Sequence, residues 1–276
     1  MANKTILKWA GSKNRIMDKL LPHLPAGRRL VEPFAGSCAV MMNTDYPAYL
    51  ISDANADLIN LYQSIKSDCD QFIKEAANWF EFVLNKNEFY KLRDVFNFSG
   101  EFSGNFANKL SRSSLFLTLN RHCFNGLCRY NSKGEFNVPF GHYKKPYFPV
   151  AEIWAFAEKA EKADLLPLEW QDTLSLVDYG DVVYCDPPYL TNEGAFTQYH
   201  HSNFSHTAHE ELAENLRALH DEIGVPVTVS NSVAAKELYS DLSFTIHEID
   251  APRTIAANGN RQPAKEIIAV LEGYHD

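Results

Sequence analysis

The sequence predicts an α/β fold of the doubly wound type, and three observations lead to this prediction. First, residues 29–34 form a short apolar strand that ends in Glu-Pro and runs into the turn Ala35-Gly36-Ser37. Second, residues 49–52 form another apolar strand, which ends at Asp53. Third, strands and helices alternate again after residue 148. A strand, a tight turn, a helix and a second strand form the repeating unit of such folds.

The individual elements follow from the spacing of apolar residues and from turn signals. Apolar residues three and four positions apart predict helices over residues 38–43, 57–65, 69–83, 88–96, 108–119, 151–162 and 209–219. Short runs rich in branched aliphatic residues predict further strands over residues 165–169, 181–185, 225–229, 244–249 and 266–271. The last two strands are expected to pair antiparallel at an edge of the sheet.

The middle of the chain has a different character. Its predicted helices lead into residues 121–147, which are dense in aromatic, glycine, asparagine and basic residues and poor in aliphatic runs. This composition is typical of a loop-rich insertion, with a hairpin expected around residues 131–134. We therefore expect one domain made of residues 1–60 and 148–276, interrupted by an inserted domain at residues 61–147.

Composition narrows the class of protein. The chain has 276 residues, of which 45% are hydrophobic and 22% charged, as in ordinary globular proteins. It contains no run of about 18 apolar residues, and its first residues lack the apolar core of a signal peptide. The five cysteines are scattered, which fits a reducing compartment better than a disulfide framework. We expect a cytoplasmic protein with no membrane partner.

Charge is unevenly distributed along the chain. The formal net charge is −9, which alone argues against binding to nucleic acid. However, residues 1–31 hold seven Lys or Arg against one acid, and residues 105–147 also hold seven against one. A chain that is acidic overall can present a basic face to phosphates. Two solvated basic surfaces without a ligand remain the alternative interpretation.

The run VVYCDPPYL at residues 182–190 carries the chemistry. Two prolines cannot continue a strand, so Asp186 and Tyr189 are presented on a stiff turn at its carboxyl end, where open α/β sheets bind ligands. The Asp186 carboxylate and the Pro187 carbonyl are two acceptors that suit the two donors of an amino group. The Tyr189 ring offers a flat face. An exocyclic amine on a heteroaromatic ring is the guest that this turn fits.

The ordered set of motifs resembles DNA adenine-N6 methyltransferases of the Dam type. The resemblance covers nearly the whole chain and is carried by residues 7–13 (LKWAGSK), 30–37 (LVEPFAGS), 51–55 (ISDAN), 125–141 (NGLCRYNSKGEFNVPFG) and 184–189 (YCDPPY). It implies a Rossmann-like class I S-adenosylmethionine-dependent methyltransferase fold with an inserted, mainly helical target-recognition domain. It also implies transfer of a methyl group to adenine N6 in duplex DNA, usually within GATC.

The resemblance assigns residues to the methyl donor and to the reaction. Catalysis is expected from Asp186, Pro187, Pro188 and Tyr189, with the target base flipped out of the duplex. The expected donor-binding residues are Trp9, Ala10, Gly11, Lys13, Glu32, Pro33, Phe34, Asp53 and Asp186. Asp53 follows the second strand, where such folds bind a ribose, and Lys13 is expected near the donor's carboxylate. Without the resemblance, a core position for Trp9 and a surface position for Lys13 would be the simpler interpretation.

DNA contacts are expected mainly from the basic, aromatic stretch. The expected residues are Lys8, Arg121, Phe124, Asn125, Leu127, Arg129, Pro139, Tyr143 and Lys144. Arg129 has the donors to bind a guanine at O6 and N7, and by resemblance it falls on a base-reading position with Leu127 and Pro139. Phe124 is expected to fill the gap left by the flipped base. Arg121, Tyr143 and Lys144 are expected on phosphates.

The residues alone are also compatible with two other functions. One is methylation of an amide or an RNA amine, because similar acid-Pro-Pro-Tyr turns suit those substrates too. The other is a sequence-specific DNA-binding module that holds the donor without turnover. The histidines and cysteines lack the spacing of a metal site, so no metal is expected. A monomer would suffice for the reaction.

Overall fold

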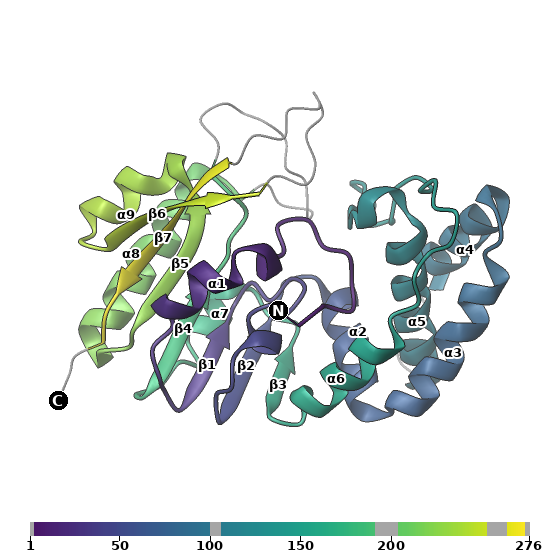
Figure 1. The fold of residues 1–276 in the computed structure, drawn as a ribbon, viewed down its shortest axis with the longest axis horizontal. Helices are drawn as coiled ribbons and strands as arrows, with labels where there is room; N and C mark the ends of the chain where they lie inside the picture. Colours follow the sequence, from purple (N-terminus) through teal and green to yellow (C-terminus); the bar gives the residue numbers. More distant parts are fainter. Residues whose placement is uncertain (1–2, 100–105, 191–203, 253–263, 274–276) are drawn as a thin grey trace.

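A computed structural model describes residues 3–99, 106–190, 204–252 and 264–273, and their backbone forms a seven-stranded sheet flanked by helices (Figure 1). The strands are β1 (Arg29–Glu32), β2 (Ala48–Ser52), β3 (Ala163–Leu166), β4 (Asp181–Cys185), β5 (Val227–Ser232), β6 (Thr245–Ala251) and β7 (Ala264–Leu271). Their order is β3-β2-β1-β4-β5-β7-β6. The first five strands pair in parallel, whereas β7 is antiparallel to both β5 and β6.

Helices cover the sheet and extend beyond one edge of it. The α-helices are α1 (Met17–Leu20), α2 (Ala56–Ser67), α3 (Cys69–Phe82), α4 (Lys86–Ser99), α5 (Phe106–His122), α6 (Val150–Ala160), α7 (Trp170–Leu174), α8 (His206–Ile223) and α9 (Lys236–Asp241). Short 3-10 turns are η1 (Lys13–Arg15), η2 (Leu21–His23), η3 (Met41–Asn43), η5 (Phe124–Gly126) and η6 (Val233–Ala235). Figure 1 shows α3, α4 and α5 standing together beyond the β3 edge, with α8 and α9 toward the β6 edge.

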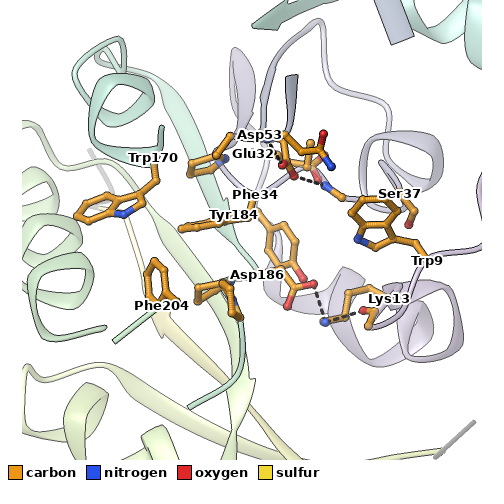
Figure 2. A pocket seen from close by; sticks show the side chains of 18 of the residues that line it. Trp9, Lys13, Glu32, Phe34, Ser37, Asp53, Trp170, Tyr184, Asp186 and Phe204 are labelled. Carbon is orange, nitrogen blue, oxygen red and sulfur yellow. Dashed lines mark hydrogen bonds and ion pairs between the residues drawn. The ribbon is translucent and has the colours of Figure 1, made fainter. Parts of the chain in front are cut away.

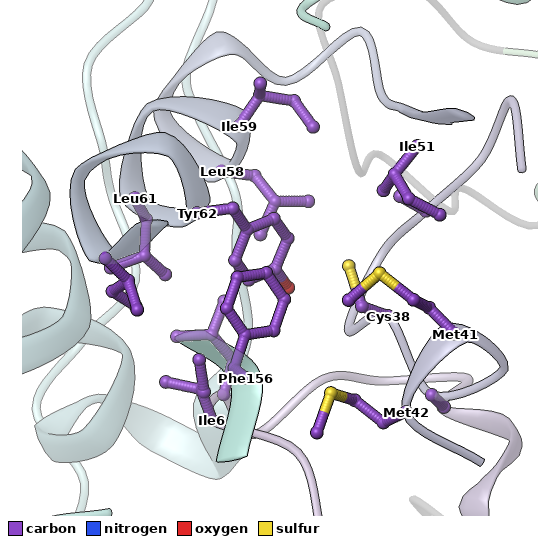
Figure 3. Packing of buried hydrophobic residues seen from close by; sticks show 14 of the residues in the cluster. Ile6, Cys38, Met41, Met42, Ile51, Leu58, Ile59, Leu61, Tyr62 and Phe156 are labelled. Carbon is purple, nitrogen blue, oxygen red and sulfur yellow. The ribbon is translucent and has the colours of Figure 1, made fainter. Parts of the chain in front are cut away.

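The central strands β1, β2, β4 and β5 are almost entirely buried because both faces of the sheet are covered. Successive side chains point to opposite faces: Leu30 of β1 joins one apolar cluster and Val31 joins the other. The first cluster is continuous from the sheet through α2 into the helices beyond it. In Figure 3, Tyr62 of α2 lies on Phe156 of α6, with ring centroids 4.7 Å apart. The helices beyond the β3 edge thus share a core with the sheet.

Two sequence predictions were wrong in detail. The helix expected over residues 38–43 is shorter, because Cys38 has a φ of 56° and is not helical, and only the 3-10 turn η3 forms at residues 41–43. The strand expected over residues 165–169 is β3, which starts earlier and ends at Leu166. Pro167 follows, and its missing N–H ends the ladder. The segment after it turns into α7, which the sequence analysis did not foresee.

Other predictions are confirmed. The last two strands, β6 and β7, pair antiparallel. Of these two, β6 is an edge strand of the sheet, whereas β7 also pairs with β5. The hairpin around residues 131–134 is present, because the Asn131 N–H donates to the Glu135 carbonyl at 2.9 Å and Tyr130 bridges Phe136. The residues that connect β6 to β7 lie mostly outside the described ranges. The proposed boundary at residue 60 falls inside α2, so the division into domains stays a prediction.

Candidate active site and DNA-facing surface

A cavity of about 470 Å³ opens at the carboxyl ends of β1, β2 and β4 (Figure 2). The chain leaves β1 toward β2 on one side, while β4 pairs on the other, so this is the point at which open α/β sheets bind ligands. The cavity brings together all the residues that the sequence analysis assigned to the donor and to catalysis. They are Trp9, Ala10, Gly11, Lys13, Glu32, Pro33, Phe34, Asp53, Asp186, Pro187, Pro188 and Tyr189.

One wall is built by the turn after β1 and the acid after β2. The Asp53 carboxylate accepts the N–H of Gly36 at 3.0 Å and the N–H of Asn55 at 2.9 Å. Gly36 has a φ of +47°, and a Cβ there would lie 2.8 Å from Nε1 of Trp9. The residue must be glycine for both reasons. The Trp9 indole therefore packs directly on the turn, and the two segments form a single wall.

Another part of the cavity lining contains an ion pair. Nζ of Lys13 lies 2.6 Å from Oδ2 of Asp186 and donates to the Gly11 carbonyl at 2.9 Å (Figure 2). Nζ also lies 4.9 Å from the centroid of the Tyr189 ring. The Lys13 side chain is only 5% exposed and the Asp186 side chain 21%. The lysine thus binds the catalytic candidate directly, a contact that its predicted place near the donor did not anticipate.

Two acids in the cavity have shifted pKa values. Burial raises the pKa of Asp186 to about 6, Lys13 opposes this rise, and the charge of Glu266 adds to it. Burial, with a smaller contribution from Asp186, raises the pKa of Glu32 to about 8. Among the described residues, Oδ1 of Asp186 and Oε1 of Glu32 have no hydrogen-bond partner. Of the two acids, Asp186 therefore keeps the lower pKa, because Lys13 lies beside it.

Several DNA-contact candidates gather around η5. Phe124 is 48% exposed, and its N–H donates to the carbonyl of the exposed Pro139 at 2.8 Å. Nζ of Lys8 lies 3.5 Å from the centroid of the Tyr143 ring. A Cβ on Gly126 would lie 2.1 Å from Cβ of Lys8, so the segment before Trp9 packs against this turn. The residues expected to bind the donor and those expected to contact DNA therefore share one stretch of chain.

The remaining DNA-contact candidates differ in exposure. Asn125, Arg129 and Lys144 are exposed, and Leu127 is half-buried. Nε of Arg129 donates to Oδ1 of Asn137 at 2.7 Å, which holds its guanidinium plane beside the hairpin. Arg121 is different, because it is 6% exposed and its guanidinium lies 5.2 Å from the Tyr147 ring centroid. Its phosphate contact stays a prediction.

Polar contacts tie the recognition hairpin to the cavity wall. Asp57, in the first turn of α2, accepts from Arg112 of α5 at 2.6 and 2.9 Å and from the Tyr130 hydroxyl at 2.8 Å. The amide nitrogen of Asn55 donates to the sulfur of Cys128 at 3.4 Å. Cys128 and Tyr130 flank Arg129, so the start of α2 fixes the backbone on both sides of that arginine.

Comparison with known proteins decides the family. The profile of D12 class N6 adenine-specific DNA methyltransferases matches residues 9–255, which include the whole cavity wall and the Asp-Pro-Pro-Tyr turn. The chain belongs to this family. Its fold is accordingly that of class I methyltransferases, and the enzyme is an adenine-specific DNA methyltransferase.

Curated relatives agree with that assignment. The methyltransferase is 49% identical to the retron Ec67 DNA adenine methylase of Escherichia coli over 96% of this chain and 90% of the relative. It is 44% identical to the DNA adenine methylase of Serratia marcescens over 97% and 98% of the two chains. It is 42% identical to that of Escherichia coli K12 over 98% and 96%.

The structure of the methyltransferase also places residues in the cavity that sequence reasoning missed. Phe34 meets Phe204 edge-on with ring centroids 5.8 Å apart, and Trp170 of α7 lies with them at the end of the cavity away from Trp9 (Figure 2). The carboxyl end of β3 lies at the same sheet edge as that of β2, and this was a usable signal for Trp170.

The described residues contain neither a membrane-spanning helix nor a cluster of metal ligands. None of the helices there is both long and apolar enough to cross a bilayer. In those same ranges, no group of three or more His, Cys, Asp and Glu side chains is arranged to hold a metal ion. Two of the histidines, His200 and His201, lie outside the described ranges.

Proposed function

We propose that this enzyme transfers a methyl group from S-adenosylmethionine to N6 of an adenine flipped out of duplex DNA, within GATC. One observation carries the proposal. The Asp186–Tyr189 turn and the wall formed by Trp9 and Asp53 face the same cavity of about 470 Å³. Acceptors for an amino group and a wall suited to a nucleoside therefore share one enclosed space. The Dam-type resemblance and the names of the curated relatives support the donor and the site.

The residues present fit the donor. The cavity volume lies within the range of about 300–1,000 Å³ typical of small-molecule sites. The donor carries cationic groups, and the buried Oδ1 of Asp186 and Oε1 of Glu32 are acceptors without partners in the described part of the chain. Asp53 is placed to accept from ribose hydroxyls, with Trp9, Ala10, Gly11 and the other predicted donor residues around it. When bound, the donor supplies an electrophilic methyl group on a sulfonium.

The turn after β4 orients the adenine amine. The Asp186 carboxylate and the Pro187 carbonyl accept hydrogen bonds from its two N–H groups, which localises the nitrogen lone pair. Tyr189 stacks on the base, and Pro187 and Pro188 limit the freedom of the backbone. Alignment and acceptors placed where charge develops supply most of the catalysis. After transfer the nitrogen is more acidic, and Asp186, with a pKa of about 6, accepts its proton.

Sequence reading is assigned to the surface around η5 and the hairpin. Arg129 binds a guanine at O6 and N7, Leu127 and Pro139 contact base edges, and Phe124 fills the space of the flipped base. Lys8 reads the outer guanine. Asn125, Tyr143, Lys144 and Arg121 contact the backbone. Residues 61–147 act in this proposal as the recognition domain and residues 1–60 and 148–276 as the catalytic domain. A monomer suffices in this proposal, because every proposed role falls on a residue of one chain.

A direct experiment tests the proposal. Plasmid from a host deficient in adenine methylation is incubated with the purified protein and S-adenosylmethionine, and modified bases are mapped by sequencing. We expect N6-methyladenine confined to GATC, and none with Asp186→Ala. Methylation in unrelated sequences would contradict the site assignment, whereas undiminished methylation by Asp186→Ala would contradict the assigned chemistry.

A further inference from the structure

We infer that Glu266 is a positioning residue for the methyl transfer, which holds the Tyr189 ring in the orientation that stacks the target base. The inference rests on the proposed function. Oε2 of Glu266 accepts from the Tyr189 hydroxyl at 2.6 Å. Glu266 lies on β7, outside the matched residues 9–255. It contacts the assumed stacking residue directly and does not line the cavity itself.

The turn leaves one freedom for Glu266 to remove. Pro187 and Pro188 restrict the backbone before Tyr189. After it, the Leu190 N–H donates to Oδ1 of Asn231 at 3.1 Å, and the Ser232 hydroxyl donates to the Leu190 carbonyl at 2.5 Å. Strand β5 thus fixes the backbone on the far side. The two side-chain torsions of Tyr189 remain, and a hydrogen bond at the hydroxyl, the atom furthest from Cα, constrains both.

The position of β7 in the sheet makes this contact possible. Glu266 stands opposite Ser232 of β5 and opposite Ile249 of β6 in the antiparallel registers. The residue that holds the ring is therefore adjacent, across the ladder, to the residue that holds the backbone after the turn. The main chain of the turn is fixed from β5 and the side chain from β7.

The charges around the ring favour this bond. Burial, together with the charges of Asp186 and Glu266, raises the pKa of the Tyr189 phenol, so the hydroxyl remains a donor across the physiological range. A bond to a carboxylate is stronger than one between neutral groups. The Lys13 ammonium approaches the same ring, 4.9 Å from its centroid. The ring is therefore held at its hydroxyl by an anion and contacted by a cation.

A double-mutant cycle tests the inference. Turnover is measured for the wild type, Glu266→Ala, Glu266→Gln, Tyr189→Phe and the Tyr189→Phe/Glu266→Ala double variant. We expect Glu266→Ala to lower kcat about tenfold, as for loss of one charge-assisted hydrogen bond, with an unchanged Kd for S-adenosylmethionine. Glu266→Gln keeps an acceptor of the same shape and should recover kcat to within about threefold of the wild type. In the Tyr189→Phe background, Glu266→Ala should cause no further loss.

A carboxylate on the neighbouring strand β6 provides the matched control. Glu248→Gln on β6 removes a carboxylate that pairs with Lys236 at 2.7 Å instead of with the turn, and it should leave kcat unchanged. Equal losses from Glu266→Ala with and without the Tyr189 hydroxyl would overturn the inference, as would an unchanged kcat in Glu266→Ala. If Glu266→Ala does not fold, a kcat of Glu266→Gln below that of Tyr189→Phe overturns it. Absence of adenine methylation by the wild type would instead contradict the proposed function.

Discussion

Replacing Lys13 by methionine should move the pH dependence of the reaction. Lys13 stabilises the ionised form of Asp186 across 2.6 Å, and the Asp186 side chain is 21% exposed. A hydrogen bond to a charged group contributes up to about 3 kcal/mol, and the burial of Lys13 favours the upper end of that range. Since one pKa unit corresponds to about 1.4 kcal/mol, the loss of this bond raises the pKa of the acid by about two. The pKa of Asp186 shifts upward because its ionised form loses the cation that stabilises it.

The assay is the pH dependence of kcat/KM for the donor, measured well below KM so that it reports groups of the enzyme before the donor binds. The wild type should lose activity as the pH falls through about 6, where Asp186 becomes protonated. For Lys13→Met that midpoint should lie at about pH 8. The value of kcat/KM should therefore drop about tenfold at pH 7 and recover toward pH 9. Glu266→Gln should move the midpoint the opposite way, because the charge of Glu266 raises the pKa of Asp186.

A matched control removes the same charge elsewhere. Lys236→Met breaks a pair with Glu248 in which both side chains are well exposed, and it should not change the pH profile. The reasoning is refuted if Lys13→Met leaves the acid midpoint at or below that of the wild type.

Three further predictions concern stability and recognition. Gly126→Ala should destabilise the fold by about 2 kcal/mol in urea unfolding and weaken DNA binding in gel shifts, because φ is +65° and the new Cβ would meet Lys8 at 2.1 Å. Arg112→Met should cost about 2 kcal/mol in the same unfolding assay, since it leaves the largely buried Asp57 without its cation. Arg129→Ala should relax the preference for its guanine by about 1–3 kcal/mol in competition binding with substituted sites.

Each of these has a matched control. Gly180→Ala has a φ of +81° but nothing nearer than 3.8 Å, so it should destabilise less than Gly126→Ala. Arg217→Met breaks an exposed i,i+4 pair with Asp221 and should cost less than about 0.5 kcal/mol. Lys133→Ala, an exposed charge in the same hairpin, should leave base preference intact. Equal effects of a variant and its control would contradict the corresponding prediction.

Local chemistry made most of the sheet predictable from the sequence. The apolar runs before Glu32, Asp53 and Asp186 are strands because parallel strands covered on both faces need apolar residues throughout. Because ligands bind at the carboxyl ends of such strands, these three acids were expected to meet in one cavity, and they do. By contrast, the positive φ of Cys38, which excludes the first residue of the expected helix, has no signal in its residue type.

Contacts between distant parts of the chain could not be predicted in this way. Lys13 pairs with Asp186 only because η1 packs at the end of β4, and no local pattern records that approach. Glu266 reaches Tyr189 only because β7 inserts antiparallel between β5 and β6, whereas the sequence supported an edge pair without fixing which strand joins β5. Trp170 entered the cavity through a short helix that propensity alone does not indicate.

The most direct test of the account is a crystal structure with a non-reactive donor analogue and a GATC duplex. The account predicts an adenine outside the helix, with N6 within hydrogen-bond distance of the Asp186 carboxylate and the Pro187 carbonyl and directed at the donor sulfur in the cavity. A structure in which the adenine stays stacked in the duplex, or in which N6 lies on the far side of the turn from the sulfur, would contradict it.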